Sequence, residues 1–305
     1  MRGYHSKEYM ATLRELKTRI GSVASTEKIT GAMKMISSAK VHSNEQSLRR
    51  LQPFKDKIKE IMGHILATDV NFNSPLIEPR EVKRVAVIVF GSDDGLCGAY
   101  NTNIMKGFLA HADGMIAKYD DSVEVDVYPV GQKVAKAIKR LRDPRFNIIE
   151  EEGVDSKMAG ARVNEFTHSL RDGFLSGKHD VVEVVYMKYH SMSRQRLAFE
   201  QLFPVSEEAI SQQAGGATTD QQLYIFEPDP NSIFNEVLPM FVLSSMQEIT
   251  IENRASEQAA RVMAMQSAND NAHKLLEELQ LEYNKLRQQS ITTELLDIVG
   301  GQVQR

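Results

Sequence analysis

Residues 252–301 read ENRASEQAARVMAMQSANDNAHKLLEELQLEYNKLRQQSITTELLDIVGG. This stretch contains no proline, and no glycine before Gly300, so nothing inside it forces a helix to stop. At about 1.5 Å per residue the helix would be roughly 75 Å long, which is more than a globular domain needs. A helix of that length must pack against something along its run, and we expect its partner elsewhere in the chain.

The opposite end of the chain, from Thr12 to about Thr68, also has the pattern of one long helix. Its apolar residues recur at alternating steps of three and four, the spacing of a coiled-coil seam. Pro53 predicts a kink, because the pattern continues beyond it. The predicted seam residues are Leu13, Leu16, Ile20, Val23, Ile29, Met33, Ile36, Leu48, Leu51, Phe54, Ile58, Ile61 and Ile65, with Ala268, Ala272, Leu275, Leu279 and Leu286 in the other helix. Each helix alone could be an ordinary bundle helix. Two such long helices at opposite ends of one chain, however, predict that they pack against each other as an antiparallel pair.

The middle of the chain alternates between β-branched and helical segments. Strands are expected at 82–90, 122–130, 146–149, 181–189, 196–205 and 223–226, helices at 102–119, 132–141 and 160–175, and a polar loop at 211–219. This alternation predicts an α/β layer with a mostly parallel sheet, finished by an antiparallel piece. We therefore divide the chain into an N-terminal long helix (1–68), a central α/β domain (69–230) and a C-terminal long helix (231–305), which Pro239 kinks or divides near its start.

Composition limits the class of protein and its compartment. The net charge of −4 over 305 residues argues against a nucleic-acid binder. The first 68 residues nevertheless carry thirteen bases and six acids, which indicates either a solvated helix face or attraction to an acidic partner. Cys97 is the one cysteine, so no intramolecular disulfide forms and a reducing compartment is expected. No apolar run approaches the ~18 residues of a membrane span, and the N-terminus lacks a signal-peptide core, so we expect a soluble, cytoplasmic type of chain.

One glycine-rich segment, Gly91–Gly98, follows a predicted strand and precedes a helix, where phosphate-binding loops occur. It lacks the Gly-Lys-Ser/Thr ending of such a loop, and Asp93 and Asp94 would repel phosphate. A tight structural turn is favoured, with Asn101 or Thr102 capping the next helix. The eight histidines show no metal-ligand spacing, and no nucleophile–base motif occurs. We expect no catalytic residue, cofactor or metal.

Four blocks of sequence together resemble the gamma-subunit family of F-type ATP synthases, the central rotor shaft. They span nearly the whole chain. The blocks are 13–20 (LRELKTRI) with 26–36 (TEKITGAMKMI), 92–103 (SDDGLCGAYNTN), 252–265 (ENRASEQAARVMAM) and 283–295 (YNKLRQQSITTEL).

This resemblance implies an antiparallel coiled coil of the terminal helices plus a central, Rossmann-like α/β domain. It implies a non-catalytic subunit that couples proton flow to ATP synthesis by rotating inside a hexameric head of alpha and beta subunits. The α/β domain would contact the epsilon subunit and the membrane ring of c subunits, on the cytoplasmic face of a bacterial inner membrane. By motif position, the residues that contact the head would be Lys28, Met33, Lys34, Glu257, Arg261, Arg287, Gln288 and Thr292.

A second hypothesis is a stand-alone coiled-coil scaffold protein with an α/β ligand-binding domain. For the polar residues that the resemblance assigns to the head contact, the alternative is that they are simply solvated on the surface of a helix. The scaffold hypothesis predicts a chain without alpha and beta partners.

Overall fold

The computed structural model describes residues 3–66, 72–119, 123–206 and 226–302. They form two compact units, and each is described by itself. The first, the helix-pair unit, is Met1–Ile36 with Val262–Arg305; the second, the sheet unit, is Ser37–Arg261. The long helices α1 (Gly3–Leu66) and α6 (Pro230–Gln302) each contribute to both units. The domain boundaries predicted at residues 68 and 231 stay a prediction.

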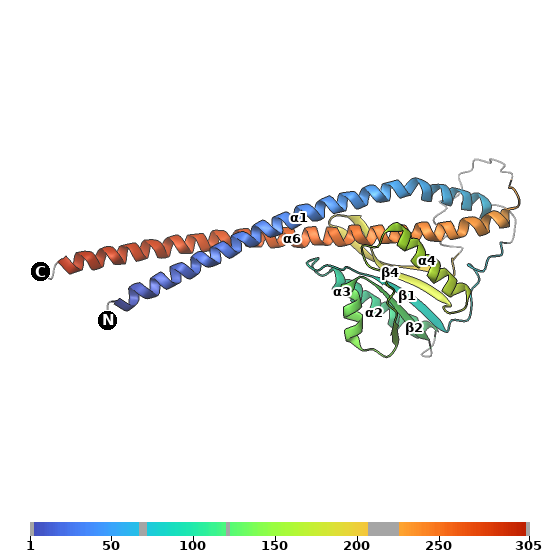
Figure 1. The fold of residues 1–305 in the computed structure, drawn as a ribbon, viewed down its shortest axis with the longest axis horizontal. Helices are drawn as coiled ribbons and strands as arrows, with labels where there is room; N and C mark the ends of the chain where they lie inside the picture. The colour runs from blue at the N-terminus through green and yellow to red at the C-terminus, as the bar shows by residue number, and fades with distance from the viewer. Residues whose placement is uncertain (1–2, 67–71, 120–122, 207–225, 303–305) are drawn as a thin grey trace. The chain divides into compact units, whose positions relative to one another are not determined.

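The sheet unit is built on five strands in the order β3-β2-β1-β4-β5. Figure 1 labels β2, β1 and β4 of this sheet. Their bounds are β1 (Arg84–Phe90), β2 (Glu124–Val130), β3 (Phe146–Ile148), β4 (Val181–Ser191) and β5 (Arg194–Phe203). β1 to β4 are parallel to one another, and β5 pairs antiparallel with β4. The mostly parallel sheet with an antiparallel final piece is thereby confirmed.

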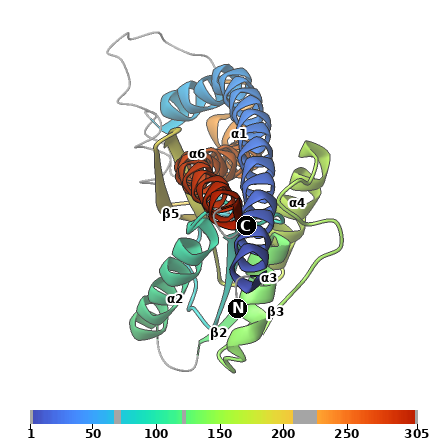
Figure 2. The same cartoon turned by 90° about the vertical axis from the view of Figure 1, so that its left-hand side faces the viewer.

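Helices cover both faces of this sheet, which is why its central strands are almost wholly apolar. On one face, Val85, Val87 and Val89 of β1 pack with α2 (Tyr100–Tyr119) and α3 (Gln132–Leu141). On the other face, Ala86, Ile88 and Phe90 pack with α4 (Gly160–Leu175) and with parts of α1 and α6. Figure 2 shows α2 and α4 on opposite sides of the strands. The sheet unit therefore takes core residues from both terminal helices.

In the helix-pair unit, α1 and α6 run antiparallel. Lys34 Nζ donates to Gln266 Oε1 at 2.8 Å, Asn269 Nδ2 donates to the carbonyl of Glu27 at 2.7 Å, and His273 Nδ1 lies 2.8 Å from Glu27 Oε1. Residue numbers rise along α6 as they fall along α1, which only an antiparallel pair allows. Ala272 and Leu279 are buried and Ala268, Leu275 and Leu286 half-buried, which confirms the seam predicted for α6.

The seam predicted for α1 is correct at its start and wrong at several later positions. Leu13, Leu16, Ile20 and Val23 are half-buried as predicted. Further along, Ile29 and Ile36 are exposed, and the buried positions are Thr30 and Ser37. The Thr30 hydroxyl is satisfied within its own helix, donating to the carbonyl of Thr26 at 3.0 Å, so a small polar residue can be buried there.

The part of α1 that lies within the sheet unit also differs from the predicted seam. Phe54 and Ile61 are exposed, while Lys55 and Met62 are buried. Lys55 is tolerated because its ammonium pairs with Glu248 of α6, and burial lowers the pKa of Lys55 to about 8. The helix continues through Pro53, and α6 is not divided at Pro239.

Most predicted elements lie where expected. The bounds of α3 and α4 match the predicted 132–141 and 160–175, and the bounds of β1 to β5 agree with the predicted ones within two residues. The predicted loop at 211–219 and most of the predicted strand at 223–226 lie outside the described residues. Across the described ranges, none of the helices offers a stretch apolar and long enough to span a membrane.

A buried histidine makes the stability of the sheet unit depend on pH. His179 is 1% exposed, its Nε2 lies 3.1 Å from the Tyr128 hydroxyl, and its Nδ1 lies 3.4 Å from Asp126 Oδ2. Burial lowers the pKa of His179 below its ordinary 6.5, against the opposing effect of Asp126. The folded chain therefore holds a neutral imidazole at pH values where the unfolded chain is protonated.

We expect the free energy of unfolding to fall as the pH drops below about 6.5 and toward the folded-state pKa, by up to about 1.4 kcal/mol per pH unit from this group. His179→Gln removes the titration and should flatten that part of the curve. Urea denaturation of the purified chain between pH 5 and 8 measures it. His42→Gln makes the same substitution at an exposed histidine and is the control for the substitution itself. An equal slope in the His179 variant and the natural chain would contradict the assignment.

Candidate functional site

The glycine-rich segment lies at the carboxyl end of β1, where parallel α/β sheets ordinarily bind ligands. The chain passes from β1 to β2 on one side of the sheet and returns to β4 on the other. The point between β1 and β4 is thus the switch point of the topology, and the crevice outside it is the first place to look for a ligand site.

The segment is tightly built. The Gly91 amide donates to the carbonyl of Val130, and the Ser92 amide donates to Asn101 Oδ1 at 3.1 Å. Gly131, which follows β2, has φ +120°, and a Cβ there would lie 3.0–3.1 Å from backbone atoms of Gly91 and Ser92. The predicted helix cap is wrong for both Asn101 and Thr102, because α2 already begins at Tyr100. The side-chain amide of Asn101 instead donates to the Ser92 hydroxyl at 2.7 Å.

Helix α6 fills the crevice with Asn253. Its Nδ2 donates to the carbonyl of Gly91 at 3.2 Å, and its Oδ1 accepts from the amide of Met187 in β4 at 3.4 Å. Oδ1 also accepts from the Tyr100 hydroxyl at 2.6 Å. This one buried amide bonds to the end of β1, to Met187 within β4 and to the start of α2, so the chain itself satisfies polar groups that a ligand would meet at this position.

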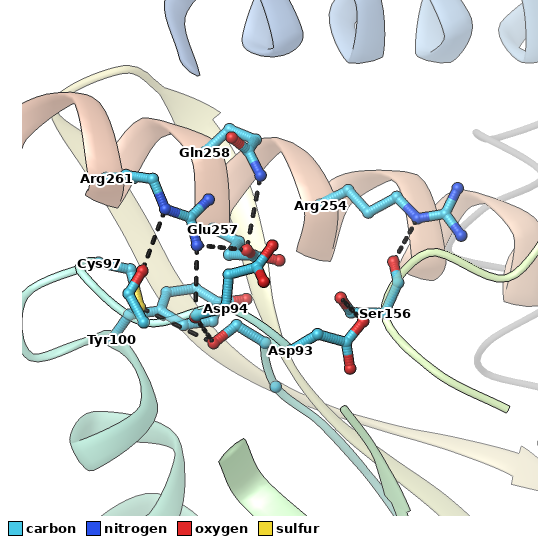
Figure 3. Close-up of polar contacts among 12 residues, drawn as sticks. Asp93, Asp94, Cys97, Tyr100, Ser156, Arg254, Glu257, Gln258 and Arg261 are labelled. Carbon is cyan, nitrogen blue, oxygen red and sulfur yellow. Dashed lines mark hydrogen bonds and ion pairs between the residues drawn. The ribbon is translucent and has the colours of Figure 1, made fainter. Parts of the chain in front are cut away.

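One helical turn further along α6, an ion pair closes over the same segment (Figure 3). Arg261 Nη2 lies 2.7 Å from Glu257 Oε1, and the guanidinium also donates to the carbonyls of Gly95 and Asp94 at 3.2 and 3.4 Å. Glu257 is 3% exposed and Arg261 5%. Burial raises the pKa of Glu257, against the opposing effect of Arg261. A buried pair of this kind is costly to break, since removing one partner leaves an uncompensated charge.

The two aspartates of the segment also have partners within the chain. Asp93 accepts from the Gln132 amide at 3.0 Å and from the Ser156 hydroxyl at 2.7 Å. Asp94 pairs with Lys157 at 2.8 Å, and this contact lowers the pKa of Asp94. The aspartates therefore brace neighbouring loops (Figure 3).

Arg254 adds a further tie between α6 and the loop before α4. Its Nε donates to the carbonyl of Ser156 at 2.7 Å, and its Nη2 donates to the carbonyl of Met158. Since Ser156 also holds Asp93, the loop, the glycine-rich segment and α6 form one connected polar network.

The network offers no evident catalytic group among the described residues. Burial raises the pKa of both the Cys97 thiol and the Tyr100 hydroxyl, so neither is an activated nucleophile. Within the part of the chain that the structure describes, no three His, Cys, Asp or Glu side chains are grouped to hold a metal ion.

The other predicted site residues lie in the helix-pair unit, at two levels. Lys28 is exposed, Met33 is half-buried, and Lys34 is bonded to Gln266. Arg287, Gln288 and Thr292 are exposed on α6, and the Thr292 hydroxyl donates to the carbonyl of Gln288 at 2.9 Å. From Gln266 to Gln288 the helix rises by about 33 Å, so the two levels are separate surfaces.

Sequence reasoning missed two features of the chain. Asn253 lies inside one of the four motif blocks, but it is not among the predicted site residues. The signal that could have singled it out is that asparagine is a weak helix former, yet here it lies inside a long predicted helix. The second feature is apolar exposure around Met33, where Ile29 is 59%, Met35 71% and Ile36 58% exposed. Exposed apolar clusters of this kind mark interaction surfaces.

Comparison with known proteins gives consistent matches along the chain. The family model described as ATP synthase matches residues 12–303. The ATP synthase gamma chain of Bacteroides thetaiotaomicron is 38% identical over 308 residues, covering 97% of this chain and 100% of that protein. The gamma chain of Stenotrophomonas maltophilia (strain R551-3) is 35% identical over 293 residues, covering 96% and 99%.

Solved structures show the same fold. A chain in the cryo-EM structure of the Euglena gracilis mitochondrial ATP synthase (OSCP/F1/c-ring, rotational state 3) aligns with a TM-score of 0.61 and 21% identity, covering 96% of this chain and 94% of that one. A chain from the rotor of the same enzyme aligns with a TM-score of 0.56 and 19% identity, covering 92% and 99%.

Proposed function

Since the chain belongs to the ATP synthase gamma-chain family, we propose that it acts as a non-catalytic rotor shaft, coupling proton flow to ATP synthesis by turning. The observation that carries this proposal is the match to gamma chains along nearly the whole length at 38% identity. A shaft of this kind acts by differential affinity: it drives a catalytic site only if its contact favours one conformation of that site over another.

The proposed partners are the alpha and beta subunits of the head, the epsilon subunit and the ring of c subunits. Support comes from the Euglena gracilis OSCP/F1/c-ring assembly, which contains a chain of this fold. We place the chain at the cytoplasmic face of a bacterial inner membrane, as a peripheral part of the complex, because the matched gamma chains come from bacteria.

At the first contact level, we propose that Lys28, Met33 and Lys34 face acidic loops of beta. Two observations support this. Ile29, Met35 and Ile36 leave apolar surface uncovered beside them, and the first 68 residues carry seven more bases than acids. Basic residues around an apolar patch fit a partner that is itself apolar and rimmed by acids.

At the second level, we propose that Arg287, Gln288 and Thr292 bond to loops of the head. All three side chains are exposed, and the guanidinium of Arg287 is suited to a carboxylate. We leave Glu257 and Arg261 out of the proposed contact, because both are buried and bonded within this chain. Their proposed part is to hold α6 on the glycine-rich segment.

The scaffold hypothesis finds less support. It needs a ligand site in the α/β domain, and the crevice where that site would lie is filled by Asn253. It also gives no account of the similarity to gamma chains.

Replacing Arg287 and Gln288 together by alanine should lower ATP synthesis by about tenfold in the assembled complex. The reason is the loss of the hydrogen bond made by the charged Arg287; such a bond is worth about 1.5–3 kcal/mol, and about 1.4 kcal/mol corresponds to tenfold. The measurement is the synthesis rate of membrane vesicles, with the yield of assembled complex determined by gel filtration.

The matched control is Glu282→Ala, an exposed residue of the same helix outside the proposed contact. It should assemble and work normally. Normal assembly of the double variant with full synthesis would rule out the proposed second contact level.

A further inference from the structure

We propose that Asn253 is the positioning residue that fixes helix α6 in rotation and register on the sheet, so that the α/β domain and the shaft turn as one body. This inference builds on the proposed rotor function. It concerns a joint inside the chain, whereas the head contacts concern its partners.

The side chain of Asn253 joins three elements of the sheet unit to α6. Its side chain reaches the carbonyl of Gly91, the amide of Met187 and the hydroxyl of Tyr100, which belong to the β1 end, β4 and α2. Its own carbonyl accepts a second contact from the Tyr100 hydroxyl at 3.1 Å. Asn253 is 1% exposed, so these bonds form away from water, where an unpaired amide is costly. One side chain thereby ties three separate elements to α6.

The surface around Asn253 shows why such a tie is needed. Ala255, Ser256 and Ala259 are each fully buried, so α6 approaches its neighbours closely through small side chains. Apolar contact is non-directional, and small residues interlock weakly. Small side chains alone fix the rotation of a helix weakly, so polar contacts must add to them: Arg254 and Arg261 reach loop carbonyls, and Asn253 reaches the sheet itself. A single buried polar residue is the best-attested device for fixing the register of packed helices.

The geometry makes this tie selective. Moving α6 by one residue turns it by about 100°, and a slide of one full turn shifts it by about 5.4 Å. Either movement separates Asn253 from Gly91, Met187 and Tyr100 together. The three bonds therefore form in one position of the helix only, and they resist torque about its axis, which apolar burial does not.

A rotor requires resistance to torque at the contact between α6 and the sheet. Helix α6 runs on from Asn253 through Arg261 to Gln302 and so belongs to both compact units. Torque entering the α/β domain must pass into that helix. A loose joint would store rotation as twist between the sheet and α6, and the sheet would follow this helix with a larger angular spread.

The test measures torsional stiffness in the assembled complex. The head is fixed to a surface, and a bead is attached through Lys106→Cys, an exposed position on α2, while the natural Cys97 is buried and should not be labelled. The variance of the bead angle during catalytic pauses reports the stiffness. We expect Asn253→Ala to raise this variance at least twofold and Tyr100→Phe to raise it less, since the Gly91 and Met187 bonds remain.

The matched control is Thr250→Ala. Thr250 is also buried on α6, but its hydroxyl donates to Met246 within the same helix at 2.8 Å. It should lower the thermal stability of the chain while leaving the angular variance unchanged. A role of Asn253 in stability alone predicts the same result for both residues, and this outcome would overturn the proposal.

Each remaining outcome tests either the proposed function or this inference. If the complex with natural residues at 100, 250 and 253 does not rotate, the proposed function fails. If it rotates and the Asn253 variant has the natural variance, the joint is elsewhere and the inference fails. Should Asn253→Ala not assemble, Tyr100→Phe takes its place, and an unchanged variance in that variant overturns the proposal.

Discussion

A disulfide between Met35→Cys and a cysteine on the facing loop of one beta subunit is expected to stop steady ATP turnover, in proportion to the yield of the bond. Met35 is 71% exposed and lies beside the proposed contact of Met33. In a rotor each beta subunit meets the shaft in turn, so a covalent tie to one of them blocks the next step. The bond forms only where the two Cα atoms come within about 4.4–6.8 Å, which makes its formation a check on the proposed contact.

ATP hydrolysis and proton pumping are measured before oxidation, after oxidation, and after reduction, which should restore both. The control carries Met35→Cys without the cysteine in beta and goes through the same oxidation; Cys97 is buried, so it should not compete. Full activity at high cross-link yield would defeat the rotor proposal. A tie at Thr293→Cys decides less, because the last turns of α6 can unwind and swivel.

Gly131→Ala is expected to destabilise the sheet unit by about 3 kcal/mol or more. Two effects add. The backbone at φ +120° is strained for any residue with a side chain, at about 1–3 kcal/mol. The new Cβ would also meet backbone atoms of Gly91 and Ser92 at 3.0–3.1 Å, which cannot move aside as the tip of a side chain can. Since single domains are stable by about 5–15 kcal/mol, this is a large share. Urea denaturation of the purified chain measures it.

Two other glycines separate these effects. Gly177 has φ +76° but nothing within 4 Å of a built Cβ, so Gly177→Ala carries the strain alone and should cost about 1–2 kcal/mol. Gly114 lies inside α2 with open space around it, so Gly114→Ala should stabilise the chain by about 0.5–1 kcal/mol. Equal losses for Gly131 and Gly177 would show that the close approach of the two loops carries no cost.

The periodicity of apolar residues predicted the helices and strands well, because an element that buries one face must repeat its apolar residues at the period of its own geometry. The bounds of α3 and α4 follow from apolar spacing. The parallel strands follow from the alternation of strands and helices, and the antiparallel pair from the place of two long helices at opposite ends of the chain. The errors in α1 arise where small or charged residues are buried in place of apolar ones. Thr30 is buried because its own helix satisfies it, and Lys55 because Glu248 lies opposite. Local spacing cannot reveal a partner almost two hundred positions away.

The same limit applies to the site. The sequence motifs indicated that Glu257 and Arg261 matter, and the structure brings these two together. That Arg261 bonds to the glycine-rich segment was not predictable, since the two carbonyls that accept from it lie more than 160 positions earlier in the chain. Asn253 shows this most clearly: its role depends on which strand ends converge beneath α6, and that is a property of the topology.

The sharing of the sheet core by both terminal helices has a consequence for synthesis on the ribosome. Ile58 and Met62 of α1 and Phe234 and Leu238 of α6 belong to one buried cluster with the strands, so the strands cannot be fully covered until the last quarter of the chain emerges. At about 5–20 residues per second, 305 residues take roughly 15–60 s. Throughout most of that time the apolar stripe of the first helix has no counterpart. The nascent chain therefore needs protection from aggregation at its beginning until its end is made.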